Sequence, residues 1–338
     1  MLNATPLNDQ DSFLPDADSK SYAYAEPHEL IAAAAGKRSA VSFDSGGVRI
    51  AAHAYVPEGT GPLPAVVLIG PETYVKEQVP TEYALRLAAR GYLALAFDPR
   101  GRGESEGDPR DVESPMGKVA DLRAALDYLE SRPDVDRDRL LAVAICQGSS
   151  EMVRAVADDN RVKALATLAG HYRDHDGDVQ WMGGEEALAA RRARAEAAKD
   201  KHQRTGEVDY VKGVDKTDPS VGMPGELVWG WYQRWADAGL WPNRFAVMSD
   251  AELLAYESMS ASARIRVPYL MFHSKQCMLP DAARRHFNAV PSPTKRAHWW
   301  GDTLHFQFYD DPRVIEPAVD RIDEWFKAYA GGKQLEPA

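Results

Sequence analysis

Cys146 stands in a sequence setting that suits a nucleophile. It follows the apolar run 141–145 and precedes Gln147 and Gly148. Small residues two positions before and after it, Ala144 and Gly148, allow backbone to approach closely at a strand-to-helix turn, as in a nucleophile elbow. The start of the next helix would lower the thiol pKa, and the backbone N–H of Gln147 would point at an oxyanion. The pattern predicts attack on an acyl carbon, with a buried structural cysteine as the alternative.

Two histidines lie where they could serve this cysteine. The final predicted strand, 294–300, runs into a loop that contains His305. A general base is expected in that loop, so we expect His305 to move the proton. His171 follows the predicted strand 162–168 and is expected to touch the substrate pocket.

Composition limits the alternatives. The 338 residues carry a net charge of −11 at pH 7, which excludes a strongly basic nucleic-acid binder. Two cysteines are too few for a disulfide framework or a thiolate metal site, and neither metal nor cofactor is expected. No apolar stretch suggests a membrane span or a signal peptide, so we expect a cytoplasmic protein. The sequence leaves open whether the chain forms a homodimer.

Strand-like and helix-like segments alternate along most of the chain. This alternation predicts a doubly wound, mostly parallel α/β sheet that opens with a hairpin. The predicted strands are 38–43, 48–56, 63–70, 92–97, 140–145, 162–168, 267–273 and 294–300. The predicted helices of this core are 80–90, 115–131, 148–157, 280–289 and 313–329.

The alternation stops between 170 and 264. That stretch contains a helical pattern at 185–204 and five of the eight tryptophans. It must bury aromatic surface, so we interpret it as a helical cap over a pocket, to which Trp181, Trp231 and Trp235 contribute. Packing of the cap on the core is the plainer explanation for these side chains. We expect a partly flexible lead-in at 1–36 and a core formed by 37–169 and 265–330. The cap is expected at 170–264 and a tail at 331–338.

Linked motifs in the core resemble those of a known family. They are Val75-Lys76-Glu77-Gln78, FDPRGRGES at 97–105, VDRDR at 135–139, Cys146-Gln147-Gly148, and His305 with Phe308-Tyr309-Asp310. With them the chain resembles the α/β-hydrolase fold superfamily, in its dienelactone-hydrolase-like branch with a cysteine nucleophile. The resemblance implies attack by Cys146, proton transfer by His305, and an oxyanion hole of two backbone N–H groups.

The second oxyanion donor and the triad acid depart from the family pattern. Pro71 has no N–H, so the resemblance places the donor at Glu72, with Thr73 as the less favoured alternative. The carboxylate of Glu72 must then turn away or pair with Lys76. No carboxylate occupies the usual acid position after the predicted strand 267–273.

Three side chains remain as candidates for the partner of His305. They are, in order of preference, Asp281, Gln276 and Asp174. The segment 98–105 contains several charged residues. We expect them to form ion pairs that hold a tight turn together, in preference to binding substrate.

These observations predict an acyl hydrolase that cleaves an ester, lactone or thioester of a small apolar or aromatic substrate through an acyl-enzyme. A natural-product acyltransferase or cyclase is the first alternative. A non-covalent isomerase or binding protein on the same fold is the second.

Overall fold

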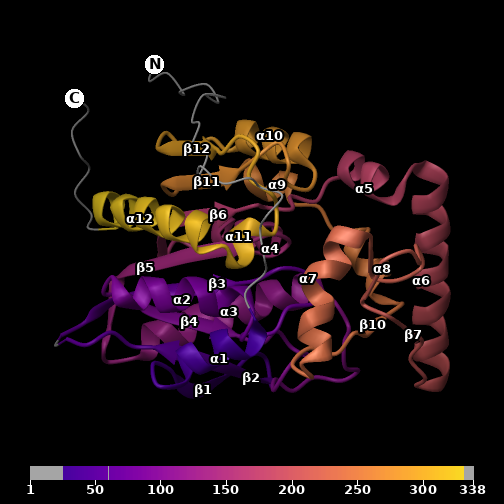
Figure 1. Cartoon of the computed structure of the whole chain (residues 1–338), viewed down its shortest axis with the longest axis horizontal. Coiled ribbons are helices and arrows are strands. Elements are labelled where there is room, and N and C mark those ends of the chain that lie inside the picture. The colour runs from indigo at the N-terminus through magenta and orange to yellow at the C-terminus, as the bar shows by residue number, and fades with distance from the viewer. Residues whose placement is uncertain (1–25, 60, 331–338) are drawn as a thin grey trace.

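The computed structural model describes residues 26–59 and 61–330. Its centre is an eight-stranded sheet with the order β1-β2-β4-β3-β5-β6-β11-β12 (Figure 1). The strands are β1 (Ser39–Asp44), β2 (Arg49–Tyr55), β3 (Leu63–Ile69), β4 (Leu93–Phe97), β5 (Val135–Ile145), β6 (Val162–Leu168), β11 (Tyr269–His273) and β12 (Lys295–Trp299). β2 pairs antiparallel with β1 and β4, and the six strands from β4 to β12 are mutually parallel. The predicted doubly wound, mostly parallel sheet is confirmed.

Helices cover both faces of the sheet. They are α1 (Pro27–Ala35), α2 (Val79–Ala89), α3 (Pro115–Ser131), α4 (Gly148–Ala157), α10 (Pro280–Ala289), α11 (Gln307–Asp310) and α12 (Pro312–Tyr329). One core cluster joins the sheet to α3, α4 and α10, and the other joins it to α1, α2 and α12. The central strands are buried on both faces, which explains why β3 and β5 read as continuous apolar runs.

The segment between β6 and β11 adds no strand to the main sheet. It contains α5 (His175–Met182), α6 (Glu185–Thr205), α7 (Glu226–Asp237), α8 (Ser249–Leu253) and α9 (Met259–Ser262). It also contains the two-residue strands β7 (Tyr210–Val211), β8 (Val214–Asp215), β9 (Met223–Pro224) and β10 (Phe245–Ala246). We call residues 170–264 the cap; α6 stands at its outer side in Figure 1.

The N-terminal boundary differs from the expectation. The lead-in predicted for 1–36 includes α1, which buries Pro27, Leu30 and Ala34 against the core. Its run of alanines favours a helix but contains few large apolar residues. The helical period of apolar residues was therefore weak in the sequence. The predicted lead-in 1–25 and tail 331–338 lie outside the described residues.

No helix in the described ranges is long and apolar enough to cross a membrane. The parallel strands instead bring their carboxyl ends to one edge of the sheet. Ligands of open α/β sheets bind outside that edge. The loops after β3, β5, β6, β11 and β12 all begin there.

Candidate active site

Cys146 occupies a strained turn between β5 and α4. Its φ is 55°, in the left-handed region that side chains other than glycine rarely adopt. The Gly148 N–H donates to the Gly70 carbonyl at 3.1 Å, and a Cβ at position 148 would lie 2.4 Å from that oxygen. The turn therefore depends on a glycine at 148 and holds Cys146 against the loop after β3.

Burial dominates the electrostatics of Cys146, which is 6% exposed. Desolvation raises the pKa of its thiol to about 11, and the nearby Tyr309 hydroxyl and Gln147 backbone N–H oppose the rise. The carboxylates of Glu72 and Glu151 add to the rise. The thiol pKa, expected from sequence to fall at the helix start, is instead raised, so the resting group is a thiol.

His305 reaches Cys146 through a tyrosine. Its Nε2 lies 3.0 Å from the hydroxyl of Tyr309, and the Cys146 thiol is near enough to that hydroxyl to raise the pKa of Tyr309. Burial and the nearby His273 lower the pKa of His305 to about 3, so its imidazole is neutral. Tyr309 follows His305 by four residues, a spacing that puts side chains on one helix face. That spacing was the available sequence signal for Tyr309, which the sequence interpretation left without a role.

The backbone N–H of Met278 takes the place expected for the acid. It donates to Nδ1 of His305 at 3.3 Å. Asp174 caps α5 and pairs with Arg285, and the Gln276 backbone forms a bridge with Leu304. Asp281 is exposed in the first turn of α10. Among the described residues, none of these three side chains hydrogen bonds to His305.

The loop after β3 meets the expected oxyanion position. The Thr73 N–H donates to Glu113 at 3.2 Å, and Pro71 has no N–H, so Glu72 carries the N–H still available at the centre of the loop. Its carboxylate turns away from the cysteine to Arg173, at 3.2 Å, and not to Lys76 as the sequence suggested. Burial raises the pKa of Glu72, and Arg173 opposes the rise.

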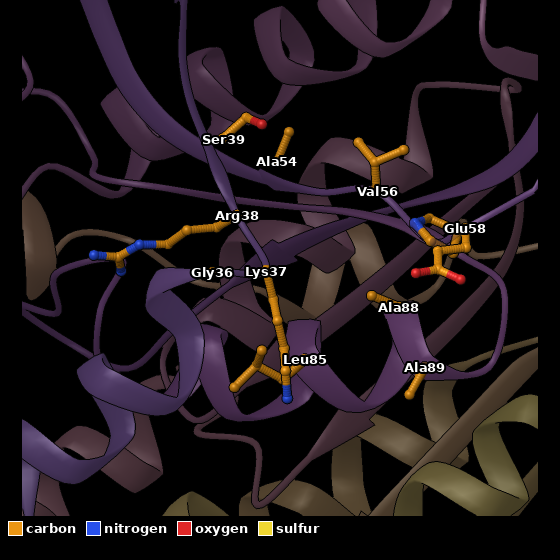
Figure 2. A pocket seen from close by; sticks show the side chains of 11 residues that line it. Gly36, Lys37, Arg38, Ser39, Ala54, Val56, Glu58, Leu85, Ala88 and Ala89 are labelled. Atoms are coloured by element: carbon orange, nitrogen blue, oxygen red, sulfur yellow. The ribbon is translucent and has the colours of Figure 1, made fainter.

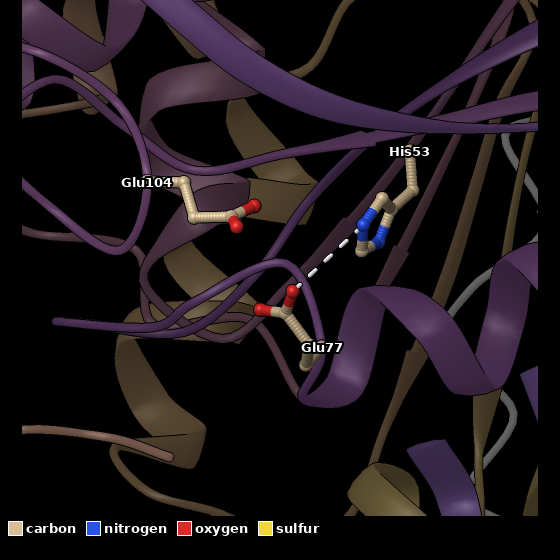
Figure 3. A group of neighbouring side chains, drawn as sticks. All are labelled: His53, Glu77 and Glu104. Atoms are coloured by element: carbon tan, nitrogen blue, oxygen red, sulfur yellow. Dashed lines mark ion pairs between the residues drawn. The ribbon is translucent and has the colours of Figure 1, made fainter. Parts of the chain in front are cut away.

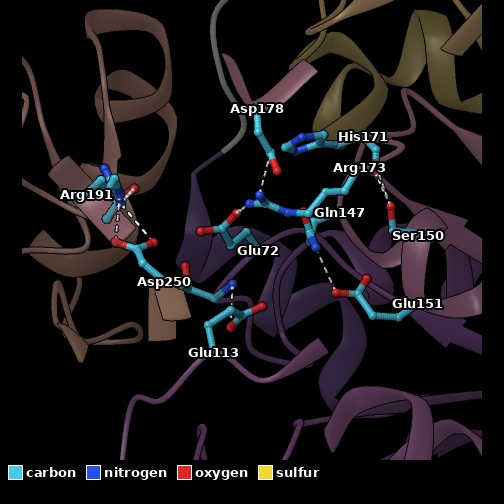
Figure 4. A network of polar contacts seen from close by, with 12 residues as sticks. Glu72, Glu113, Gln147, Ser150, Glu151, His171, Arg173, Asp178, Arg191 and Asp250 are labelled. Atoms are coloured by element: carbon cyan, nitrogen blue, oxygen red, sulfur yellow. Dashed lines mark hydrogen bonds and ion pairs between the residues drawn. The ribbon is translucent and has the colours of Figure 1, made fainter. Parts of the chain in front are cut away.

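Arg173 lies at the centre of a buried network of polar groups that includes Gln147, the neighbour of Cys146 (Figure 4). The guanidinium is 3% exposed and donates to Gln147 at 2.9 Å, to Asp178 at 2.8 Å and to Glu72. Gln147 in turn donates to Glu151 at 2.9 Å. These contacts join the elbow, the oxyanion loop and α5 of the cap. A lone arginine after a strand gives no sequence signal of such distant partners, and sequence reasoning missed it.

Aromatic side chains cover the opposite side of Cys146. The Trp231 ring packs edge-on against Tyr309 at 4.9 Å, and its indole N–H donates to Asp310 at 3.0 Å. Trp235 packs on Trp231, and its buried N–H has no partner among the described residues. Trp231 therefore joins the cap to the core, and Trp235 has a hydrogen-bond donor to offer a ligand.

His171 lies directly behind the nucleophile. Its backbone N–H donates to the Cys146 carbonyl at 2.9 Å, and its ring lies 6.3 Å from that of Trp181. Burial, with smaller contributions from Arg173 and His305, lowers the pKa of His171 well below its usual range. Its buried Nε2 has no partner in the described part of the chain, as for a group that awaits a ligand.

A second polar cluster, at His53, Glu77 and Glu104, has the side chains of a metal site (Figure 3). Its cation is Lys76, whose ammonium lies 2.9 Å from Glu77 and 2.6 Å from Glu104. Lys76 also pairs with Asp98 at 2.8 Å. The charges around 98–105 thus staple the turn, as expected, and leave a metal no place in this cluster.

A surface pocket of about 500 Å³ lies between β1, β2 and α2 (Figure 2). Lys37, Arg38 and Glu58 supply its charges, and Leu85 its apolar wall. Because Tyr55 pairs with Ala94 near the start of β4, the pocket lies toward the amino edge of the parallel strands. It is therefore separate from the site at Cys146.

Comparisons with known proteins agree with this fold. The family model described as X-Pro dipeptidyl-peptidase (S15 family) matches residues 46–307. The solved structure of DcsB with its substrate analogue superposes with a TM-score of 0.73 at 19% identity, over 87% of this chain and all of that chain. The α/β hydrolase GrgF from Penicillium sp. sh18 also gives 0.73 at 19% identity, over 86% of this chain and 98% of that chain.

Three curated relatives match shorter stretches of the chain. The uncharacterized protein PA2218 of Pseudomonas aeruginosa is 44% identical over 123 residues, 36% of this chain and 33% of that protein. The thiohydrolase aneE of Aspergillus aculeatus is 29% identical over 36% of this chain and 38% of its own. The quorum-quenching protein AidA of Acinetobacter baumannii is 31% identical over 37% of this chain and 41% of its own. The chain spans about a third of the length of the first curated relatives it matches.

Proposed function

Since the chain belongs to the X-Pro dipeptidyl-peptidase (S15) family of α/β hydrolases, we propose that it hydrolyses acyl compounds through a covalent intermediate on Cys146. The observation that carries the proposal is the elbow itself. Cys146 has a φ of 55° at the end of a central parallel strand, with the N–H of Gln147 directed at its sulfur. Structural cysteines have no need of such strain, whereas nucleophiles do.

The reaction follows from the groups around the sulfur. Cys146 attacks the acyl carbon, and the backbone N–H groups of Gln147 and Glu72 receive the developing oxyanion. The leaving group departs with a proton, and water then releases the acid. His305 and Tyr309 form the hydrogen-bonded pair beside the sulfur that handles protons.

A thioester is the substrate class we favour. The thiohydrolase names among the relatives support it, and a thiol exchanges with a thioester at little cost in bond energy. The unpaired indole N–H of Trp235 and Nε2 of His171 would hydrogen bond to polar atoms of the substrate, while the rings of the cap contact an apolar or aromatic acyl group. Natural-product intermediates carry such acyl groups.

Acyl transfer or ring closure is a second candidate. It needs a site from which water is excluded, and the aromatic cover over a nearly buried Cys146 favours it. In that reaction the acyl group passes from Cys146 to a hydroxyl or amine instead of to water.

Intact-protein mass spectrometry tests the covalent intermediate. The protein is exposed briefly to a panel of acyl thioesters, aryl esters and lactones, and the products are identified. We expect an acyl adduct on the wild-type protein and none on Cys146→Ala.

Cys277→Ala is the matched control, because Cys277 is also buried but contacts Ser274 in the loop after β11. It should form the same adduct as wild type. A free acid as product supports hydrolysis, and a new ester, amide or ring supports transfer. Full turnover by Cys146→Ala would overturn the proposal in favour of a non-covalent reaction.

A further inference from the structure

The proton of the Cys146 thiol must leave when the sulfur attacks. In a conventional triad the histidine accepts it at Nε2, while a carboxylate accepts the Nδ1 proton. Here Nδ1 of His305 accepts a hydrogen bond from the Met278 backbone N–H. A neutral imidazole has one N–H, so that proton resides on Nε2. His305 thus presents a donor, and not a base, to the site.

The protein environment keeps His305 in that state. A second proton on Nδ1 would oppose the N–H of Met278 directly. The imidazole is 4% exposed and lies in contact with the rings of Phe306 and Tyr309, which offer a charged imidazolium no counter-ion. Each feature disfavours proton uptake by His305.

The Tyr309 hydroxyl lies between the two groups. It is within hydrogen-bond reach of His305 Nε2, at 3.0 Å, and it lies close enough to the Cys146 sulfur to oppose the rise in the thiol pKa. The Tyr309 side chain is 1% exposed and is held by the rings of Trp231 and Phe306. A hydroxyl can donate one proton while it accepts another, which an Nε2–H cannot do.

Resting on the proposed function, we propose that Tyr309 carries the proton from Cys146 to the leaving atom of a thioester or ester, and that His305 orients and polarises Tyr309. As the bond from sulfur to the acyl carbon forms and the bond to the leaving atom breaks, the thiol proton moves to the Tyr309 oxygen. The phenolic proton moves at the same time to the leaving thiolate or alkoxide. Tyr309 ends the step as a phenol, and His305 stays neutral throughout.

Deacylation reverses the same path. Water attacks the acyl carbon and gives one proton to the Tyr309 oxygen, while the phenolic proton returns to the departing sulfur of Cys146. The bond between carbon and sulfur breaks, the acid leaves, and the thiol is restored. No oxidant, metal or further base takes part.

Single-turnover acylation rates test the relay. They are measured by rapid quench and intact mass on wild type, Tyr309→Phe, His305→Gln and Tyr83→Phe. The substrates share one acyl group and differ in leaving group: an alkyl thiol, which needs a proton to leave, and a nitrothiophenol, which does not. Tyr83→Phe is the matched control, because this buried hydroxyl donates to the Phe308 carbonyl at 2.7 Å.

We expect Tyr309→Phe to slow acylation by both thioesters, because the Cys146 proton must leave in either case. The alkyl thioester should lose about 100-fold or more, and at least about tenfold more than the nitrophenyl thioester, whose leaving group needs no proton. A structural role for Tyr309 would slow both substrates equally. Tyr83→Phe should leave both rates within about threefold of wild type, because its hydroxyl touches no reacting atom.

His305→Gln separates an orienting donor from a base. The glutamine amide can donate to Tyr309 from a position close to that of Nε2 but accepts no proton at neutral pH. We expect it to keep acylation within about tenfold of wild type, whereas loss of a general base would cost about 100- to 10,000-fold. The two variants are independent, so a folding defect in one leaves the other decisive.

The outcomes separate this inference from the proposed function. If wild type forms no adduct on Cys146, the proposed function fails. If wild type forms the adduct but Tyr309→Phe slows both substrates equally, or His305→Gln loses more than about 100-fold, the relay is wrong and His305 is the base.

Discussion

Polar groups are buried on two sides of Cys146, and the protein compensates the cost of burying them differently on each side. The charged flank, Arg173 with Glu72, Asp178, Gln147 and Glu151, compensates buried charge with ion pairs and hydrogen bonds. The aromatic flank, His305 and Tyr309 with Trp231 and Phe306, contains neutral hydrogen-bonding groups within packed rings. In the proposed mechanism the charged flank fixes the positions of backbone donors, and the aromatic flank moves a proton without creating a charge.

The largest effect should come from removing the central cation of the charged flank. Arg173→Met leaves Glu72 and Asp178 buried without their partner, at a cost of about 3–5 kcal/mol in the free energy of unfolding. Urea unfolding measures it. Lys327→Met breaks an exposed pair with Asp323 and should cost less than about 1 kcal/mol. Equal losses in the two variants would mean that the charged flank contributes no more than a surface ion pair.

Glu151 gives the charged flank a dependence on pH. Burial raises the pKa of Glu151 from 4.5 to about 7. Between these values the folded protein binds more protons than the unfolded chain, so its stability falls as pH rises through that window. Glu151→Gln should remove this pH-dependent loss. Between pH 4 and pH 8 the loss in the free energy of unfolding is on the order of 3 kcal/mol for the wild-type protein.

Unfolding in urea at intervals from pH 4 to 8 follows this effect. Glu324→Gln, at an exposed position of α12, is the control and should keep the wild-type slope. If Glu151→Gln keeps the wild-type dependence of stability on pH, the Glu151 carboxyl does not titrate between pH 4 and 8.

The two flanks meet where the elbow approaches the loop after β3. Gly148→Ala places a methyl group 2.4 Å from the Gly70 carbonyl, so the two segments must separate. We expect a loss of about 1–3 kcal/mol in stability and about 100-fold in the rate of acylation. Gly36→Ala, where a Cβ meets nothing within 4 Å, should retain full activity. An active Gly148→Ala would show that the elbow tolerates a wider spacing.

The smallest effect is expected at the outer edge of the aromatic flank. Trp231→Phe keeps a ring beside Tyr309 but removes the N–H that donates to Asp310, at a cost of about 1 kcal/mol in stability. Thermal unfolding measures it, with Trp229→Phe as a partly buried control. No difference between the two variants would indicate that packing alone anchors α7.

The sequence predicted the core well because the core is periodic. The buried strands 63–70 and 140–145 and the helix 148–157 emerge from local apolar patterns, and all three were found. The small residues around Cys146 likewise predicted a tight turn. What local patterns could not predict was which distant loops meet that turn.

Contacts between segments explain the parts that differ. Lys76 was a reasonable partner for Glu72 by proximity in sequence, but Arg173 reaches Glu72 from the loop after β6. The helix start at Gly148 suggested a lowered thiol pKa, yet burial by the cap raises it. The partner of His305 is a backbone N–H, which carries no residue signature at all.

The cap is also fastened to the loop at 70–74, where we propose the second oxyanion donor. The Tyr232 hydroxyl donates to the Glu72 carbonyl, and the Trp241 indole donates to the Thr73 carbonyl, each at 2.7 Å. Cap and loop therefore form one structural unit. A chimera that exchanged residues 170–264 with a relative, in search of new substrates, would have to transplant the loop at 70–74 along with them.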